Sequence, residues 1–449
     1  MEVTAIFDIG KTNKKIFLFD RDLHVLYQDA AQIDEIDDDD GFPGDNLSQI
    51  TAWMNETLGV LIQRGFNIKR INFSAYGASL VFLDAEGNLT TPFYNYLKPY
   101  PENVNQLFDE KYGSEAWSQQ TASPKLHMLN SGLQIFWLKY QKPSLFKDVR
   151  TILHFPQYFH YYFTGQACSE YTSIGCHTGL WNFAKGDYHQ WVYEEKWNDL
   201  FPKIVSAHCT RRIFIHGNQV EVGVGIHDSS SALYPYLLFD DKPFILVSTG
   251  TWSIAMNPFN TEPLTDGELE ADCMLYLQPD GNPVKAARLF LGNEHRVQVD
   301  FLNEAFNKEK DFHQKMRFNK EYYLKGKDIR KPFFHFEGIR QKNPPLTNQI
   351  TAFTSFEEAY HRLIFELVHC QVEAIHLSKG ASQVDRLYVD GGFAGNEVFM
   401  RVLAQELSSF ETMVCEAPLG SALGAVTVMA GASFDRDFLQ KHFGIKRVE

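Results

Sequence analysis

Two similar glycine turns, one near the start of the chain and one in its second half, constrain the fold more than any other feature. Residues 6–12 read Ile-Phe-Asp-Ile-Gly-Lys-Thr, and residues 247–252 read Val-Ser-Thr-Gly-Thr-Trp. In each turn an apolar strand leads to a glycine, Gly10 or Gly250, and a second strand follows. We expect both glycines to adopt positive φ, so that N–H groups of the turn form an anion-binding concavity. One such hairpin would be an ordinary turn, but its repetition predicts two phosphate-binding loops around one nucleotide, with added donors from Thr12, Thr249 and Thr251.

Length and charge fit two packed domains and exclude several kinds of partner. The chain has 449 residues, 44% of them hydrophobic, and a formal net charge of −14 at pH 7. Its length is about two to three times that of a typical domain. Nucleic acid and anionic membranes both require a basic surface, so neither is expected as a partner. We place the boundary between an N-terminal domain, residues 1–238, and a C-terminal domain, residues 239–449.

Cysteine usage and the chain start point to a soluble, reduced protein. The six cysteines are scattered without a C-x-x-C pair, so neither a zinc site nor a disulfide framework is indicated. The chain does not open on a basic segment followed by an apolar run. No stretch reaches the roughly 18 apolar residues of a membrane span. A reducing cytoplasm is the expected location.

The first half reads as alternating strands and helices. Predicted strands cover residues 4–7, 15–19 and 70–75, a helix covers 47–64, and a hairpin joins strands at 80–83 and 90–94. The acidic stretch 34–40 is interpreted as a solvated loop, because it lacks the glycine and glutamate spacing of a calcium loop. Gly77 and Asn95 would lie at strand ends, where α/β folds bind ligands, although turn structure alone could explain Gly77.

Residues 221–233 contain the main candidate for a catalytic group. An alternating strand ends at His227 and Asp228, and small hydroxyl residues then open a helix. An Asp at such a junction is usually only the N-cap of the helix. The second glycine turn follows within twenty residues, because Ser248 is 248 − 228 = 20 positions on. The Asp228 carboxylate could therefore face the space between the two loops and act as a base on a hydroxyl that attacks phosphate.

The second half repeats the pattern of strand, turn and helix. Ser355 and Glu358 form a predicted capping box at the start of a helix that runs to about residue 379, and strands follow at 386–389 and 412–415. Between those strands, Gly391 and Gly392 would let a flat ligand lie against the backbone, and Asn396 would cap the next helix. The small residues of 418–425 predict a closely packed helix.

Taken in order, these motifs resemble the FGGY carbohydrate kinases of the actin-like ATPase superfamily. The resemblance covers both halves, through residues 8–15, 169–182, 227–232, 247–253, 391–396 and 420–425. Within the family, His-Asp-Ser at 227–229 and Ser-Thr-Gly-Thr-Trp at 248–252 are most similar to rhamnulokinases and fuculokinases. Those enzymes phosphorylate the ketose forms of 6-deoxy sugars, such as L-fuculose and L-rhamnulose, at O1.

The resemblance implies an α/β fold of two actin-like (ribonuclease H-like) ATPase domains, with a nucleotide and sugar cleft between them. It also implies ATP and Mg²⁺ as cofactors, Asp228 as general base and Asp8 beside the metal. The implied ATP-binding residues are Asp8, Gly10, Lys11, Thr12, Asn13, Lys15, Thr249, Gly250, Thr251, Gly391, Gly392 and Asn396. The implied sugar-binding residues are Gly77, Ala78, Asn95, His227, Asp228 and Ser229.

The chain departs from the family pattern at several of these positions. Lys11 and Lys15 stand where the family usually has Thr and Arg, and Ala78 and Ser79 replace an acidic residue. In residues 289–298, where rhamnulokinases have a substrate-binding Asn and an ATP-contacting Gln, no Asn matches in position and only Gly292 and Gln298 align loosely. The alternatives are another FGGY substrate (a pentulose or polyol), an actin-like ATPase or nucleotide-dependent binding module without sugar kinase activity, and a sugar-binding regulator that does not turn over. A homodimer also stays open.

Overall fold

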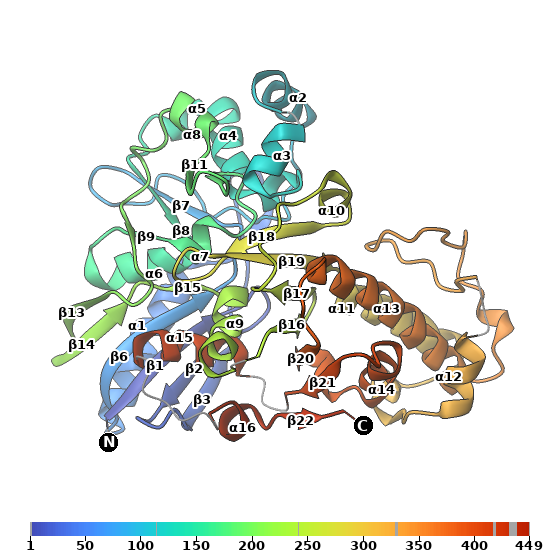
Figure 1. Cartoon of the computed structure of the whole chain (residues 1–449). Coiled ribbons are helices and arrows are strands. Elements are labelled where there is room, and N and C mark those ends of the chain that lie inside the picture. Colours follow the sequence, from blue (N-terminus) through green and yellow to red (C-terminus); the bar gives the residue numbers. More distant parts are fainter. Residues whose placement is uncertain are drawn as a thin grey trace.

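Figure 1 shows two β-sheets with helices packed around and between them. The computed structural model describes residues 2–113, 115–240, 242–327, 331–415, 419–430 and 438–448. Within these residues, no helix combines the length and the apolar composition that a membrane crossing needs.

The first sheet is built by the first half of the chain, in the order β13-β14-β6-β1-β2-β3 with β15 on β6. Its strands are β1 (Glu2–Ile9), β2 (Lys14–Phe19), β3 (Val25–Ala31), β6 (Asn67–Ala75), β13 (Thr210–Ile215), β14 (Asn218–Gly223) and β15 (Ile226–His227). β1 is antiparallel to β2 and parallel to β6. The predicted strands at 4–7, 15–19 and 70–75 are confirmed.

The second sheet repeats this arrangement in the order β18-β19-β17-β16-β20-β21-β22. Its strands are β16 (Phe244–Thr249), β17 (Ser253–Asn257), β18 (Cys273–Leu277), β19 (Pro283–Leu289), β20 (Arg386–Gly391), β21 (Glu411–Val414) and β22 (Lys446–Arg447). β16 is antiparallel to β17 and parallel to β20, as β1 is to β2 and β6. The duplication predicted from the two glycine turns is therefore present in the strand pairing.

Two helices lie together between the sheets and join them. α9 (Asp228–Phe239) follows β15, and α15 (Gly420–Ala430) comes from the far end of the chain but packs on β1 and β6 of the first sheet (Figure 1). One continuous core unites Ile6 of the first sheet, Leu246 of the second, and Leu233 and Ala422 of the two helices. Pro418, which the sequence places just before α15, lies outside the described residues.

Some of the other helices pack on the two sheets, and the rest form a separate apolar cluster in the first half or pack on other helices. In the first half they are α1 (Leu47–Gln63), α2 (Glu102–Lys111), α3 (Glu115–Thr121), α4 (Ser131–Gln141), α5 (Pro143–Phe146), α6 (Phe155–Thr164), α7 (Tyr171–Ile174) and α8 (Gln190–Glu194). In the second half they are α10 (Asp266–Glu270), α11 (Leu291–Ala305), α12 (Lys320–Lys327), α13 (Phe356–Lys379), α14 (Glu397–Glu406) and α16 (Phe438–Phe443). The predicted helices at 47–64 and 355–379 are confirmed.

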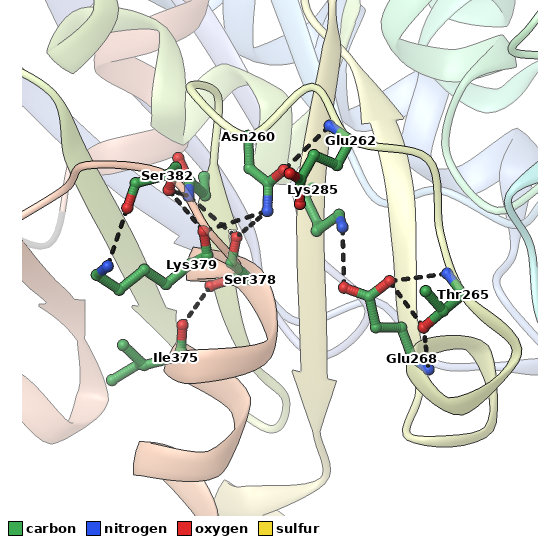
Figure 2. Close-up of polar contacts among 10 residues, drawn as sticks. Asn260, Glu262, Thr265, Glu268, Lys285, Ile375, Ser378, Lys379 and Ser382 are labelled. Atoms are coloured by element: carbon green, nitrogen blue, oxygen red, sulfur yellow. Dashed lines mark hydrogen bonds and ion pairs between the residues drawn. The ribbon is translucent and has the colours of Figure 1, made fainter.

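The ends of α10 and α13 show how polar contacts fix the edge of the second sheet (Figure 2). At α10, Thr265 and Glu268 form a reciprocal capping box, and the buried Lys285 of β19 donates to Glu268 at 2.9 Å. At the end of α13, the Asn260 side chain donates to the carbonyls of Ser378 and Lys379 at 3.1 and 3.2 Å. These contacts satisfy backbone groups that a helix end leaves without partners.

The start of α13 differs in detail from the predicted capping box. Ser355 is the N-cap and accepts from the Glu358 N–H, as expected. The Glu358 carboxylate, however, accepts from the backbone N–H and the hydroxyl of Thr354, one residue further out. Thr354 offers the Glu358 carboxylate two donors, its N–H and its hydroxyl, whereas the N–H of Ser355 would offer only one.

The predicted hairpin between 80–83 and 90–94 is wrong. β7 (Leu80–Leu83) pairs with β8 (Thr151–His154), and only an isolated bridge, Leu83 to Leu89, remains of the expected pairing. β8 binds one edge of β7, where the Arg150 N–H donates to the Leu83 carbonyl, while on the opposite edge the Thr90 N–H donates to the Phe82 carbonyl and the local pairing ends after one bridge. Asn95 consequently lies in a loop, where its side chain donates to the carbonyl of Pro43 at 2.8 Å.

The acidic stretch lies at the surface but is more than a solvated loop. Lys98 contacts Asp38 at 2.5 Å and Asp40 at 2.9 Å, and Lys142 contacts Asp39 at 2.6 Å and Asp40 at 2.8 Å. The two lysines are mostly buried, so their charges need these carboxylates as partners. The acidic stretch therefore stabilises the positions of the two segments that carry Lys98 and Lys142.

Candidate active site

A cavity of about 620 Å³ opens between the two sheets, at the ends of their central strands. Its walls bring together predicted site residues that are far apart in the chain: Asp8, Gly10, Lys11, Thr12, Asn13, Lys15, Gly77, Ala78, His227, Asp228, Ser229, Thr249, Gly250, Thr251 and Gly391. Three predicted residues do not line it, namely Asn95, Gly392 and Asn396. Both glycine turns thus face one space.

A second cavity, of about 740 Å³, adjoins the first and shares Gly391 with it. Gly392 and Gly395 line it, together with basic residues of α14 and β22. Gly391 has φ of 82°, and a Cβ there would lie 1.9 Å from the Thr249 carbonyl oxygen, so only glycine fits. The two cavities meet where the second glycine turn touches β20.

Asn396 lies beside this second cavity in a structural role. It is the N-cap of α14, where its side chain accepts from the Phe399 N–H at 3.1 Å, and it donates to the Tyr360 hydroxyl at 2.8 Å. The cap was predicted from the sequence and is confirmed.

The two glycine turns are hairpins closed by their own backbone. The Gly10 N–H donates to the Asn13 carbonyl at 2.9 Å, and the Gly250 N–H donates to the Trp252 carbonyl at 2.8 Å. The prediction of positive φ at Gly10 and Gly250 is wrong, since neither belongs to the positive-φ glycines. At Gly10 the requirement is space, because a Cβ would lie 3.2 Å from the Asn13 carbonyl oxygen. These two N–H groups are used within the turns, so other donors must face an anion.

Each sheet places one carboxylate and one hydroxyl at the same pair of strand ends, in exchanged positions. Asp8 of β1 is in register with Ser74 of β6, whereas Ser248 of β16 is in register with Asp390 of β20. Burial raises the pKa of Asp8 to about 6 and that of Asp390 to about 6. The Ser421 hydroxyl of α15 donates to Asp8 at 2.8 Å. The duplicated fold therefore carries a buried acid from each half into one cavity.

Asp228 is the first residue of α9 and does not act as its cap. His227 takes the N-cap position, and the Asp228 carboxylate accepts from the N–H and hydroxyl of Ser229 at 2.6 and 3.2 Å. The Asp228 side chain keeps 34% of its surface exposed and lines the cavity. Burial raises its pKa to about 6. The cap interpretation is therefore wrong, and the carboxylate is open to a ligand.

The ring of His227 contacts the Asp228 carboxylate. Its Nε2 lies 3.1 Å from Asp228 Oδ1 and 3.0 Å from Cys176 Sγ. Burial lowers the pKa of His227 to about 3, so the ring is neutral where it contacts Asp228. The His227 N–H donates to Thr172 Oγ1 at 3.0 Å, and that hydroxyl donates to the buried Glu170. A series of polar contacts through His227 and Thr172 thus links Asp228 to Glu170.

The lysines of the first turn have different surroundings. Lys11 Nζ contacts Glu35 and Asp45, each at 2.9 Å, and Lys14 Nζ contacts Asp45 at 2.5 Å. Burial would raise the pKa of Asp45, but hydrogen bonds from Lys14 and Tyr76 hold it below its usual value. Lys15 lines the cavity, and its charge opposes the rise in the pKa of Asp8. The Lys11 ammonium is therefore engaged by carboxylates, although the residue also lines the cavity.

Sequence reasoning missed several residues that line the cavity. They are Tyr76, Tyr96, His177, Trp252, Tyr276, Arg288 and Asp390. Four of these, Trp252, Tyr276, Arg288 and Asp390, come from the second half, and Tyr276 and Arg288 lie in a region whose pattern was uninformative. A charged Arg among the apolar residues of β19 was the available signal, although Lys285 of the same strand does not line the cavity.

The carboxylates at the cavity fit a hard divalent cation. Asp390 Oδ1 is buried without a hydrogen-bond partner among the described residues, and burial raises the pKa values of Asp8 and Asp390. Mg²⁺ is usually held by one or two carboxylates together with water and phosphate oxygens. Asp8 and Asp390 offer such ligands.

Comparison with known proteins agrees with this arrangement. The model of the FGGY family of carbohydrate kinases, N-terminal domain, matches residues 3–226, and the model of the carbohydrate kinase FGGY C-terminal domain matches residues 241–437. A rhamnulokinase of Yersinia pestis (strain Pestoides F) is 29% identical over 236 residues, which are 50% of this chain and 46% of the relative. An L-fuculokinase of Salmonella typhi is 21% identical over 278 residues, 57% of this chain and 56% of the relative. The matched region thus spans about half the length of these curated relatives.

Solved structures extend the likeness in fold to nearly the whole chain. The crystal structure of a carbohydrate kinase from Novosphingobium aromaticivorans superposes with a TM-score of 0.78 at 24% identity, over 95% of this chain and 91% of that one. The predicted two-domain α/β architecture is confirmed.

Proposed function

Because the chain belongs to the FGGY family of carbohydrate kinases, we propose that it transfers the γ-phosphoryl group of ATP to a sugar hydroxyl. The observation that carries the proposal is the position of Asp228. Its carboxylate opens into the cavity that both glycine turns line. Phosphoryl transfer depends on positioning and charge neutralisation, and it needs one group to take the proton of the attacking hydroxyl.

ATP is proposed to lie across both cavities. The phosphates occupy the space between the turns, where Lys15, Thr12 and Thr251 supply charge and donors, and the nucleoside occupies the second cavity beside Gly391 and Gly392. Asp8, with Asp390, would hold Mg²⁺, which neutralises phosphate charge when it is bound. We also propose residues 1–238 and 239–449 as the two domains, a division supported by the limits of the two family models.

Asp228 is proposed as the general base. Its carboxylate is kept in one orientation by Ser229 and by His227 Nε2. Asp228 accepts the proton as the sugar oxygen attacks phosphorus in line with the leaving oxygen of ADP. The fixed orientation lowers the entropic cost of reaching that geometry.

The proposed acceptor is O1 of a 6-deoxy-ketose, with L-rhamnulose and L-fuculose as the first candidates. The support is the similarity to a rhamnulokinase and an L-fuculokinase and the His-Asp-Ser tripeptide that ends at Ser229. Gly77, Ala78 and His227 line the cavity beside Asp228 and are proposed sugar contacts. A Cβ on Gly77 would lie 2.7 Å from Cys176 Sγ and 3.2 Å from the His227 ring, so glycine keeps this wall in place.

A substrate panel tests the proposed function. ADP release is measured with MgATP and L-fuculose, L-rhamnulose, L-ribulose, D-xylulose or glycerol, and product is identified by mass. We expect strong turnover with one 6-deoxy-ketose. Turnover with a pentulose or glycerol alone would contradict the substrate assignment. Slow ADP release that no sugar changes would contradict the kinase and favour a nucleotide-dependent binding module.

The pH dependence of turnover should report the base. Because burial raises the pKa of Asp228 to about 6, the base is protonated and inactive below that pH and becomes active as the pH rises. We expect kcat/KM for the sugar to fall by about tenfold or more per pH unit below about 6. Asp8 and Asp390 titrate in the same range and steepen the fall. A flat profile between pH 5 and 7, measured at saturating MgATP, would contradict a carboxylate base.

A further inference from the structure

Arg288 of β19 is a buried cation in the cavity to which the proposed reaction gives no role. Only 5% of the residue is exposed. Its Nε and Nη2 donate to the two carboxylate oxygens of Asp272 at 3.3 and 3.0 Å, and the guanidinium lies 4.8 Å from the centre of the Trp252 ring. This places the guanidinium plane in a fixed orientation, since it is held on one edge by a carboxylate and on one face by an indole.

The remaining edge of the guanidinium is open to the cavity. Among the described residues, Nη1 donates no hydrogen bond, yet it is not one of the buried atoms without a partner, so the cavity reaches it. An arginine carries five N–H donors, and Asp272 engages only part of them. Nη1 can therefore donate to a ligand without giving up the ion pair.

Arg288 packs on Trp252, which follows the second glycine turn, and lines the cavity together with Tyr276. The Tyr276 ring packs against two residues of the first half, because it lies 5.6 Å from the His227 ring and 6.0 Å from the His177 ring. The pKa values of Tyr96 and Tyr276 respond to the charges of both Asp228 and Arg288. Arg288 and Asp228 thus line one cavity together with Tyr96, His177 and Tyr276, which form the compartment considered for the sugar.

We propose that Arg288 is a specificity-determining residue of the sugar site, which donates from Nη1 to hydroxyl oxygens of a neutral ketose at the end remote from Asp228. This inference rests on the proposed kinase function. The first half offers no charged donor at the cavity wall beside Gly77, where Ala78 stands. The second half therefore supplies it, and the sugar bridges the two sheets.

Charge balance sets the substrate class. Asp272 neutralises Arg288, and Asp228 leaves the compartment with a negative charge. A sugar with a carboxylate at its far end would add a second negative charge in a site shielded from water, which is costly. The site accordingly selects neutral ketoses over their acidic analogues.

The Arg288–Asp272 ion pair is held in place by a backbone hydrogen bond between the same two residues, and a similar ion pair lies nearby on β19. The Arg288 N–H donates to the Asp272 carbonyl at 3.1 Å, which fixes the backbone between β18 and β19. Three residues earlier on β19, Lys285 makes the similar buried pair with Glu268 (Figure 2) but does not line the cavity. Lys285 is thus a matched control for the loss of a buried cation from this strand.

The test compares steady-state constants for the sugar and for ATP in four variants. In Arg288→Met we expect the KM for the best ketose to rise by about 10–100-fold, because the donors are lost, with the KM for ATP changed by less than about twofold. Arg288→Lys keeps the charge but loses the planar fork, and we expect an intermediate rise. Lys285→Met should leave both constants near those of the unmodified protein.

Asp272→Asn gives a test that does not depend on removing the arginine. It frees the full charge of Arg288, and we expect the 6-carboxylate analogue of the best ketose to gain at least about tenfold in kcat/KM relative to the neutral ketose. Thermal unfolding of each variant separates lost binding from lost structure.

The outcomes distinguish this inference from the proposed function. If the unmodified protein phosphorylates a ketose while Arg288→Met keeps its sugar KM, or raises the KM for ATP equally, the role of Arg288 is overturned and the kinase stands. An unchanged substrate preference in Asp272→Asn would also overturn it. If the unmodified protein turns over no sugar, both the proposed function and this inference fall.

Discussion

Asp228→Asn is expected to lower the rate of phosphoryl transfer by about 10²–10⁴-fold while the KM for ATP changes little. Asparagine has nearly the same shape as aspartate and can still accept from the Ser229 N–H, which contacts Asp228 at 2.6 Å. It cannot take a proton from the attacking hydroxyl. The expected effect is therefore on kcat, and binding of ATP should survive because the glycine turns are untouched.

The measurement is sugar-dependent ADP release in a preparation free of other kinases, together with an ATP titration that follows intrinsic tryptophan fluorescence, to which Trp252 of the cavity contributes. Asp199→Asn, an exposed carboxylate of the first half, is the matched control and should leave kcat unchanged. Residual activity within about tenfold of the unmodified protein would contradict the base assignment.

Gly424→Ala is expected to destabilise the fold by about 3 kcal/mol or more, as an overpacked core does at the upper end of its range. The two helices between the sheets cross at this glycine, and a Cβ there would lie 1.7 Å from the backbone carbonyl oxygen of Ser231. A backbone atom cannot turn aside as a side chain can, so α15 must move away from α9. The Ser231 hydroxyl, which donates to the Ser421 carbonyl at 2.6 Å, loses that partner.

The same displacement should also lower activity. Ser421 donates to Asp8 at 2.8 Å, so a shift of α15 moves a hydrogen-bond donor of the proposed metal ligand. Chemical unfolding and ADP release measured on the same preparation report the two effects. Gly267→Ala in α10 is the control: no atom lies within 4 Å of a Cβ there, and helix propensity makes the change neutral or stabilising by up to about 1 kcal/mol. Equal stability of both variants would contradict the close contact between the helices.

Secondary structure with a strong local pattern could be predicted from the sequence. The periodic apolar residues of α1 and α13 and the strands on either side of Gly10 were recovered, because burial of one face demands that spacing. The duplication was also visible, since Gly10 and Gly250 end equivalent strands. Where pairing is long-range, local reasoning failed: it did not predict the pairing of β7 with β8, which is far away in the chain, and the strand expected at 90–94 is reduced to a single bridge.

The residues of the candidate site also differ in whether a local sequence signal could predict them. The residues of the strand-turn motifs, such as Asp8 and Asp228, could be found from the sequence, because a polar residue at the end of an apolar strand is a local signal. Arg288 and Asp390 could not be assigned to the cavity, since each lies in a segment whose position depends on the packing of the two sheets. Lys11 shows the converse, because its ammonium is bound by Asp45 from a distant loop.

The sequence by itself therefore determined the two strand-turn-strand units, the helices with strong periodicity and the membership in a kinase family. The tertiary structure decided which carboxylates meet in one cavity, which lysines are already neutralised by ion pairs, and that an arginine of the second sheet faces the compartment beside Asp228. The physical reason is the separation along the chain over which each kind of interaction acts. Burial periodicity and turn chemistry act within a few residues, whereas charge pairing and cavity walls depend on segments that only the packed sheets and the helices α9 and α15 bring together.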